Sequence, residues 1–189
     1  MLDIHPFDET HIDDLTALFA TDDTADRCWC MWFITTYKEF HTAGREGNRA
    51  AFITYTIDEP EPMGLIAYDN DQPVGWCAVG PRSRYVRAVK TPTMKRRSGD
   101  DDTVWFVPCF FVHPDHRSVG VAATLLDAAV ELARRAGARA IQGFPLSGST
   151  RRQSGSDLMT GNETLFTSAG FDVESRPSNK RAIMNRDLA

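Results

Sequence analysis

The sequence has no apolar run that approaches the roughly 18 residues of a membrane-spanning helix. Its first ten residues, MLDIHPFDET, lack the basic and apolar regions of a secretory signal peptide, which favours a cytoplasmic protein. It also lacks an excess of basic residues, because 21 Lys and Arg stand against 26 Asp and Glu and the formal net charge is −5. We therefore expect neither a nucleic-acid-binding nor a membrane protein, and the negative charge mildly favours a cationic substrate.

Cysteines are few, and their spacing lacks the second pair that is typical of a zinc site. Cys77 and Cys109 stand in the apolar strings GWCAVG and VPCFFV, which indicates buried thiols in a reducing compartment. Cys28 and Cys30 form an isolated Cys-x-Cys pair. We expect no metal and no catalytic thiol, and a metal-linked redox protein built on this pair is the less favoured alternative.

The length of 189 residues predicts one domain, residues 1–189. Apolar periodicity and turn signals predict four helices and seven strands. The helices are expected at 8–20, 36–57 (broken near Gly44 or Gly47), 118–136 and 160–169, and the strands at 2–6, 63–69, 73–80, 103–112, 139–145, 170–175 and 180–187. The order β-α-α-β-β-β-α-β-α-β-β predicts an α/β (α+β) fold, one mixed sheet flanked by helices.

Pro108 lies in the middle of the strongest predicted strand, TVWFVPCFFV. A proline has no N–H to donate to a neighbouring strand, so it requires an edge, a bulge or a gap. We therefore expect the pairing between strands 103–112 and 139–145 to be broken at this point.

The segment VHPDHRSVGVA, residues 112–122, leaves this strand and enters the strongest helix. Backbone N–H groups of a first helical turn attract anions, Gly120 permits close approach, and Arg117 adds a positive charge. A pyrophosphate fits such a site, although an ordinary strand-to-helix turn with an incidental arginine remains the alternative. The segment lacks the Gly-Lys-Ser/Thr of a nucleotide P-loop and the glycines of a dinucleotide fold.

The longer segment CFFVHPDHRSVGVAATLLDAAVELARRAGA resembles the acetyl-CoA-binding motif of the GNAT N-acetyltransferase superfamily, which reads Gln/Arg-x-x-Gly-x-Gly/Ala between a strand and a helix. The string LFTSAGF at 165–171 and the order of elements are similar to that family as well. Residues 26–40 and the string GWCAVGPR resemble an uncharacterised bacterial subgroup. The resemblance implies a GNAT-like fold and acetyl-CoA as cosubstrate. It also implies transfer of an acetyl group to a primary amine by direct attack in a ternary complex.

The resemblance also implies which residues bind the cofactor. The backbone of residues 117–122 is expected to bind the pyrophosphate, and the strand ending at Val112 is expected to pair with the pantetheine arm. The residues assigned to the cofactor in this way are Phe110, Val112, Arg117, Ser118, Val119, Gly120, Val121, Ala122, Asn162 and Phe166.

The sequence departs from the family at the positions that carry catalysis. Phe166 stands where many members have a tyrosine that protonates the departing thiolate, and the predicted strand 103–112 carries no acidic residue. We therefore assign no catalytic residue. A CoA-binding regulatory or interaction module without acyl transfer is the alternative function.

The acceptor is expected to be the amine of a small molecule or peptide, including a lysine side chain, and a homodimer is left open. Trp29 and Trp32 are candidates for the acceptor pocket, with a core plug as the alternative, and Arg82 and Tyr85 are candidates with a solvated connector as the alternative. The connector, residues 81–99, carries seven basic residues and no acid: Arg82, Arg84, Arg87, Lys90, Lys95, Arg96 and Arg97. It is interpreted either as a solvated loop or as an anion-facing wall.

Overall fold

The computed structural model describes residues 2–94, 103–147 and 159–188. Within them the strands form one seven-stranded sheet in the order β1-β2-β3-β4-β5-β7-β6. The strands are β1 (Asp3–Pro6), β2 (Gly64–Asp69), β3 (Gln72–Pro81), β4 (Val104–Val112), β5 (Ala140–Gly143), β6 (Asp172–Ser178) and β7 (Arg181–Asp187). In this described sheet β4 and β5 pair in parallel and the other neighbours are antiparallel, so the predicted mixed sheet is confirmed.

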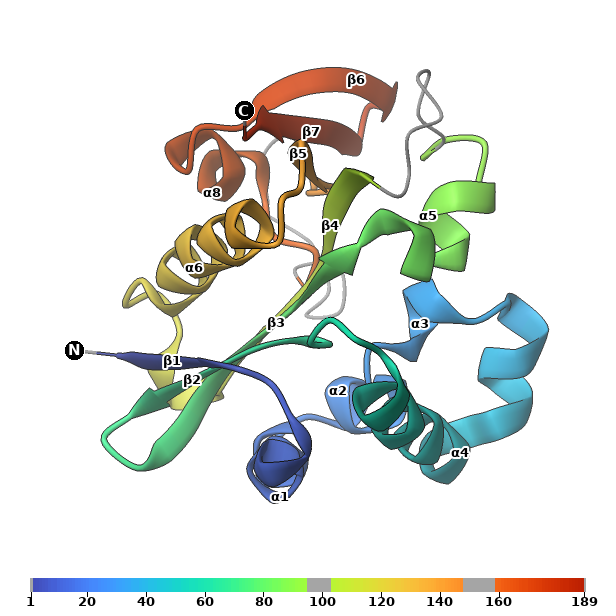
Figure 1. Ribbon diagram of the computed structural model, residues 1–189, viewed down its shortest axis with the longest axis vertical. Helices are drawn as coiled ribbons and strands as arrows, with labels where there is room; N and C mark the ends of the chain where they lie inside the picture. The colour runs from blue at the N-terminus through green and yellow to red at the C-terminus, as the bar shows by residue number, and fades with distance from the viewer. Residues whose placement is uncertain (1, 95–102, 148–158, 189) are drawn as a thin grey trace.

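Helices cover both faces of the sheet (Figure 1). On one side lie α6 (Val121–Arg135), the crossover between β4 and β5, and α8 (Glu163–Ser168). On the other side lie α1 (Ile12–Phe19), α2 (Asp23–Cys28), α3 (Met31–Ile34), α4 (Tyr37–Asp58) and α5 (Val86–Lys90). Short 3-10 turns are η1 (Glu9–His11), η2 (Arg82–Arg84) and η4 (Pro114–His116).

The helices on the α1–α5 side differ from the prediction in two places. The sequence pattern predicts an irregular stretch between residues 20 and 36, yet this stretch forms α2 and α3. The two helices are separated because Trp29 and Cys30 both have positive φ angles, 45° and 55°. The connector after β3 contains η2 and α5. The predicted break in the helix over 36–57 is confirmed at Gly44, whose φ is 62° inside α4.

Two apolar cores lie on the two faces of the sheet. On the α6 face, Leu125, Leu126 and Ala129 are fully buried against the strands, as the three-and-four spacing of the helix predicts. On the other face, Phe52 and Trp76 belong to a dense aromatic cluster beneath α1 and α4. The sheet is therefore fixed from both sides, and this rigidity positions the ends of its central strands.

The sheet opens between β4 and β5. Their parallel pairing runs from Val104 and Ala140 to Val107 and Gly143 and stops there, directly before Pro108. On its other side, β4 remains paired with β3 as far as Val112, with a register shift between Ala78 and Gly80. The predicted break at Pro108 is confirmed, and it leaves the second half of β4 with one open edge.

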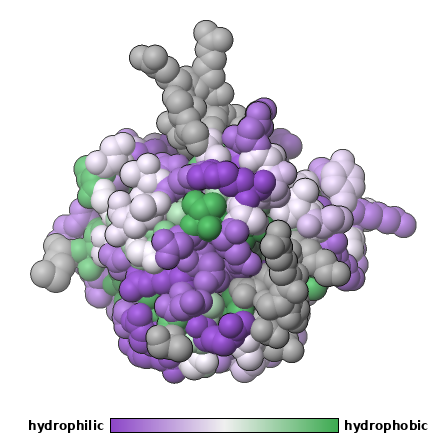
Figure 2. Space-filling model, turned by 90° about the horizontal axis from the view of Figure 1, so that it is seen from above, coloured by the Kyte–Doolittle hydropathy of each residue, from purple (hydrophilic) through white to green (hydrophobic). Residues whose placement is uncertain are grey.

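The surface seen from the β6–β7 end is mainly hydrophilic (Figure 2). Large exposed hydrophobic side chains in the described parts of the chain are scattered, at Tyr37, Ile57, Val119 and Val173. No helix within residues 2–94, 103–147 and 159–188 has the length and apolar character that crossing a membrane requires.

Candidate functional site

A first cavity of about 370 Å³ lies where β4 passes into α6. Its walls come from the end of β4, the turn containing η4, the first turn of α6 and the segment that leads into α8. The lining residues are Phe110, Phe111, Val112, His116, Arg117, Ser118, Gly120, Val121, Ala122, Ala123, Met159, Gly161, Asn162 and Leu165. The strand-to-helix segment singled out in the sequence thus forms one wall of a real cavity.

The N-terminus of α6 has the properties of an anion site. Gly120 is the N-cap with a φ of 95°, no side chain caps the helix, and its first turn contains no acidic residue. A Cβ added at Gly120 would meet no atom within 4 Å, so the space beside it is open. Arg117 is exposed nearby, and its Nε donates to the carbonyl of Val112 at 3.2 Å, which fixes the direction of the guanidinium. The free N–H groups, the helix dipole and this charge all favour a bound anion.

Most of the residues predicted to bind the cofactor line this cavity. They are Phe110, Val112, Arg117, Ser118, Gly120, Val121, Ala122 and Asn162. The side chain of Asn162 also accepts a hydrogen bond from the N–H of Leu165 at 2.9 Å and so caps α8.

Val119 and Phe166 do not line the cavity. Val119 is 72% exposed, because it sits on the outer side of the turn before Gly120. Phe166 is fully buried and packs edge-on against Phe110 and Phe171, with ring centroids 6.1 and 5.1 Å apart. Its expected place beside the cofactor thus differs from its observed place in the core. The amphipathic pattern of α8 fits both places.

A short segment, residues 159–161, spans the opening between β4 and β5. The N–H of Phe110 donates to the carbonyl of Met159 at 2.5 Å, and the N–H of Leu146 donates to the carbonyl of Gly161 at 3.0 Å. The open edge of β4 is therefore satisfied by the protein's own backbone at Phe110. Pairing of a pantetheine arm with this N–H requires the bond to Met159 to be exchanged.

A second cavity of about 730 Å³ borders the same segment and is lined in part by side chains of α2, α3, α4 and α5. It is lined by Thr24, Arg27, Cys28, Cys30, Trp32, Phe33, Phe40, Arg87, Thr91, Thr93, Met94, Pro108, Cys109, Phe144, Met159, Thr160 and Arg181. Met159 lines both cavities, so the two spaces adjoin at this residue. Such a size suits a small organic molecule or the end of a flexible chain.

The candidates for the acceptor pocket separate into one that lines this cavity and three that do not. Trp32 lines it. Trp29 is fully buried between Phe19 and Phe52, so the structure places it in the core, the alternative left open for it. The arrangement follows from the left-handed backbone at Trp29, which turns the two indoles in different directions.

Arg82 and Tyr85 also lie away from the cavity, in the interior. Nη2 of Arg82 donates to the carbonyls of Ala88 and Met94 at 2.6 and 2.5 Å, so this arginine holds the connector together. Tyr85 is 1% exposed and packs edge-on against Phe106. The expectation that these two residues face the acceptor is not met, because the connector folds back onto the sheet as η2 and α5.

In the described part of the connector, residues 81–94, the basic side chains form neither a solvated loop nor a continuous wall. Arg84 is buried and bonds Glu59 at 3.2 Å and two backbone carbonyls, while Arg87 lines the second cavity and Lys90 is exposed. Lys95, Arg96 and Arg97 lie outside the described residues. The number of charged residues along the sequence does not distinguish the buried Arg84, the cavity-lining Arg87 and the exposed Lys90.

Two thiols of the second cavity, those of Cys28 and Cys109, are held in the neutral form. Burial raises the pKa of Cys28 to about 12, and a hydrogen bond with Cys30 together with burial raises the pKa of Cys109 well above its usual range. A neutral thiol is a weak nucleophile. No carboxylate, imidazole or phenol is among the described residues that line this cavity, so the described wall offers no side-chain general base.

Several lining residues carried no signal in the sequence. Met159 and Phe144 come together only because the sheet opens beside Pro108, and Arg87 was one of seven similar charges. Within the described residues no cluster of three or more His, Cys, Asp or Glu side chains could hold a metal ion.

The sequence matches the profile of a known protein family. A sequence profile described as "Acetyltransferase (GNAT) family" matches residues 9–144, more than half of the chain. No curated protein sequence matches significantly.

Solved structures share the fold across the whole chain. PaiA N-acetyltransferase from Thermoplasma acidophilum, solved with coenzyme A, is 12% identical with a TM-score of 0.58, and the match covers 99% of each chain. YncA from Salmonella typhimurium, solved with acetyl-CoA, is 16% identical with a TM-score of 0.59, covering 100% of this chain and 94% of that one. An N-acetyltransferase from Staphylococcus aureus Mu50 is 14% identical with a TM-score of 0.60, covering 100% and 99%. With the profile match over residues 9–144, these likenesses lead to one conclusion: the chain belongs to the GNAT family of acetyltransferases.

Proposed function

We propose that this protein is an N-acetyltransferase that moves the acetyl group of acetyl-CoA to a primary amine by direct attack in a ternary complex. The observation that carries the proposal is the pair of cavities that meet at Met159, one with an anion site and one lined by aromatic and arginine side chains. Both lie in what we take to be a single domain, residues 1–189. The free cysteines of the described chain fit a cytoplasmic location.

The first cavity fits the cofactor. The uncapped N–H groups of α6 and the positive charge of Arg117 would hold the pyrophosphate, and the open space at Gly120 lets it approach the backbone. The edge of β4 at Phe110 would hold the pantetheine arm once its N–H is released from Met159. Among solved members of the fold, the Thermoplasma acidophilum and Salmonella typhimurium proteins were determined with coenzyme A and acetyl-CoA respectively.

Transfer of the acetyl group requires no strong acid from a side chain. Acetyl-CoA supplies a thioester: the amine nitrogen bonds to the acetyl carbon, the carbon–sulfur bond breaks, and the thiol gains the proton that the amine loses. A thiol is a tolerable leaving group without a strong acid, since its pKa is about 8.5. Bringing amine and thioester together across Met159 would then be the protein's main contribution.

Direct attack is favoured over a covalent intermediate by the state of the thiols. Cys28 and Cys109 are protonated because their pKa values are raised, so neither is a good acceptor for the acetyl group. Water would accept the amine proton and supply a proton to the departing thiolate.

The test is release of CoA thiol from acetyl-CoA with a panel of primary amines, together with a direct measurement of CoA binding. Acetyl transfer to at least one amine, with rates that depend on both substrates in an intersecting pattern, supports the proposal. CoA binding without acetylation of any amine would contradict it and support the alternative, a CoA-binding regulatory or interaction module.

A further inference from the structure

The second cavity is basic although the protein as a whole is acidic. Arg27, Arg87 and Arg181 line it, and no Asp or Glu is among the described lining residues. The net charge of −5 predicts a cationic partner, but the charge next to a bound molecule matters more than the sum over the surface. The cavity itself therefore favours a negative group.

Arg87 is the arginine whose surroundings point to a ligand. Its guanidinium carbon lies 4.0 Å from the centroid of the Trp32 ring, which holds the group flat against the indole. Nε and Nη2 are buried and have no hydrogen-bond acceptor among the described residues. These two nitrogens form one edge of the guanidinium, the edge that binds both oxygens of a carboxylate. Leaving charged donors buried and unsatisfied is costly, so an acceptor that displaces the groups covering this edge would be favoured.

The neighbouring arginines make the contrast clear. Arg84 bonds the carboxylate of Glu59 and the carbonyls of Glu61 and Pro62, so its donors are used inside the protein. Arg87 comes from the same stretch of chain, lines the cavity and has no such partners in the described structure. A structural role accounts for Arg84 and leaves the donor edge of Arg87 unexplained.

The remaining walls define the rest of the ligand. Trp32, Phe33, Phe40 and Phe144 line the cavity with aromatic rings, and Met159 forms its border with the first cavity. Aromatic walls favour an apolar or planar body. The reacting amine has to face Met159, because the acetyl group would arrive from that side.

We propose that the acceptor is a small amine that carries a carboxylate and an apolar, preferably aromatic, body, with the carboxylate bound to the Nε–Nη2 edge of Arg87. This inference rests on the proposed function and names the substrate class of the same site. An aromatic amino acid has all three groups and is the simplest probe.

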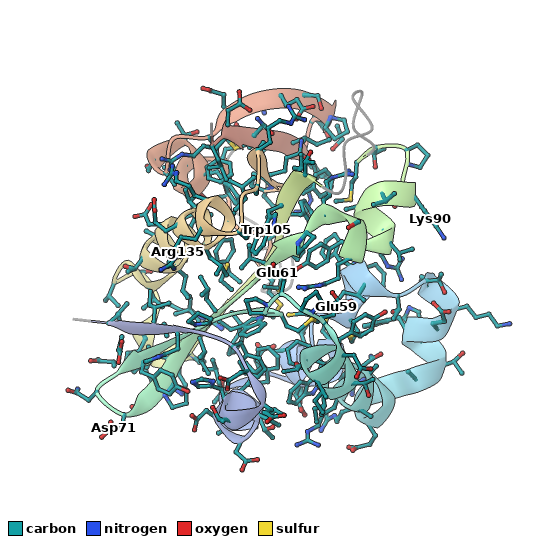
Figure 3. All side chains as sticks on the ribbon, viewed as in Figure 1. Glu59, Glu61, Asp71, Lys90, Trp105 and Arg135 are labelled. Atoms are coloured by element: carbon teal, nitrogen blue, oxygen red, sulfur yellow. The ribbon has the colours of Figure 1, made fainter. Side chains whose placement is uncertain are left out.

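The experiment compares phenylalanine, phenylalaninamide and phenethylamine as acceptors for the wild type, for Arg87→Gln and for Lys90→Gln. Lys90 lies on the same helix and points outward (Figure 3), is exposed and does not line the cavity, so its variant makes the same charge change elsewhere. We expect Arg87→Gln to raise the KM for phenylalanine about tenfold or more, as loss of a charge-assisted pair predicts, with little change for phenethylamine. Lys90→Gln should match the wild type, and Arg87→Lys should lose part of the preference because it keeps the charge without the fork.

The decisive quantity is how far Arg87→Gln changes the ratio of kcat/KM for phenylalanine to that for phenylalaninamide, since the intrinsic reactivity of the two amines cancels in that comparison. An unchanged ratio, with the variant folded and binding CoA normally, would overturn the carboxylate proposal while leaving the proposed function intact. A preference for the phosphonate analogue of phenylalanine over phenylalanine would overturn it in favour of a phosphoryl-bearing amine. If no amine is acetylated, the proposed function fails, and calorimetric binding of phenylalanine against phenylalaninamide to the CoA-loaded protein decides the carboxylate proposal separately.

Discussion

Gly120 and Gly137 provide a matched pair for testing the cofactor site. They flank the two ends of α6, both have positive φ angles (95° and 78°), and a Cβ at either would meet no atom within 4 Å. An alanine at either position therefore strains only the backbone, by about 1–2 kcal/mol for the left-handed conformation. The two variants, Gly120→Ala and Gly137→Ala, should lose similar amounts of unfolding free energy.

Binding of CoA should separate the two variants. Gly120 lines the first cavity at the N-terminus of α6, whereas Gly137 follows the far end of the helix. A methyl group at Gly120 stands where the pyrophosphate is proposed to approach the N–H groups. The Kd for CoA should therefore rise about tenfold or more, or about 1.4 kcal/mol. Gly137→Ala should leave the Kd within about twofold, which is within the scatter expected of a remote surface change.

Isothermal titration calorimetry with CoA and urea unfolding of the same samples measure the two quantities. Equal Kd values for the two variants would refute the placement of the pyrophosphate at Gly120. A much larger loss of stability at Gly120 than at Gly137 would show that Gly120 has a structural role that its open surroundings do not reveal.

Three further outcomes follow from the same structure. Arg117→Glu should weaken CoA binding at least about tenfold, because it puts a negative charge beside the proposed pyrophosphate. The same change at Arg135, at the exposed far end of α6 (Figure 3), should leave CoA binding unchanged. Calorimetry measures both variants, and equal effects would argue against the site. Phe166→Tyr should lower the unfolding free energy by about 1–3 kcal/mol, because it buries a hydroxyl beside Gly143, and should not raise kcat; a higher kcat at unchanged stability would contradict this. Incubation with acetyl-CoA alone should add no acetyl mass to the protein from pH 6 to pH 9, because the raised pKa of Cys109 keeps its thiol protonated over this range. An acetylated cysteine in the mass spectrum would refute direct attack.

The main elements and the first cavity could be predicted from the sequence because local patterns specify them. The spacing of Leu125, Leu126 and Ala129 marks the buried face of α6, and Pro108 marks the point where the sheet opens. The first cavity depends on a contiguous strand, turn and helix, so residues 110–122 are enough to locate most of it.

The second cavity could not be predicted in the same way. Its walls come from α2 to α5, the middle of β4, the segment after β5, the segment before α8 and the start of β7, which are far apart in the sequence. The left-handed backbone at Trp29 and Cys30 decides that Trp32, and not Trp29, reaches the cavity, and no residue pattern signals this at non-glycine positions. Likewise, the sequence does not distinguish Arg87 from Arg82 and Arg84. Only tertiary contacts show that Arg82 and Arg84 are hydrogen-bonded inside the protein and that Nε and Nη2 of Arg87 have no acceptor among the described residues.

A crystal structure with CoA tests the central claim most directly. The account predicts the pyrophosphate within hydrogen-bonding distance of the N–H groups of residues 118–122. It also predicts the pantetheine along β4 in place of the bond between Phe110 and Met159, with the thiol opening into the cavity lined by Trp32 and Arg87. A pyrophosphate bound elsewhere, or a thiol directed away from that cavity with Phe110 still bonded to Met159, would contradict the account.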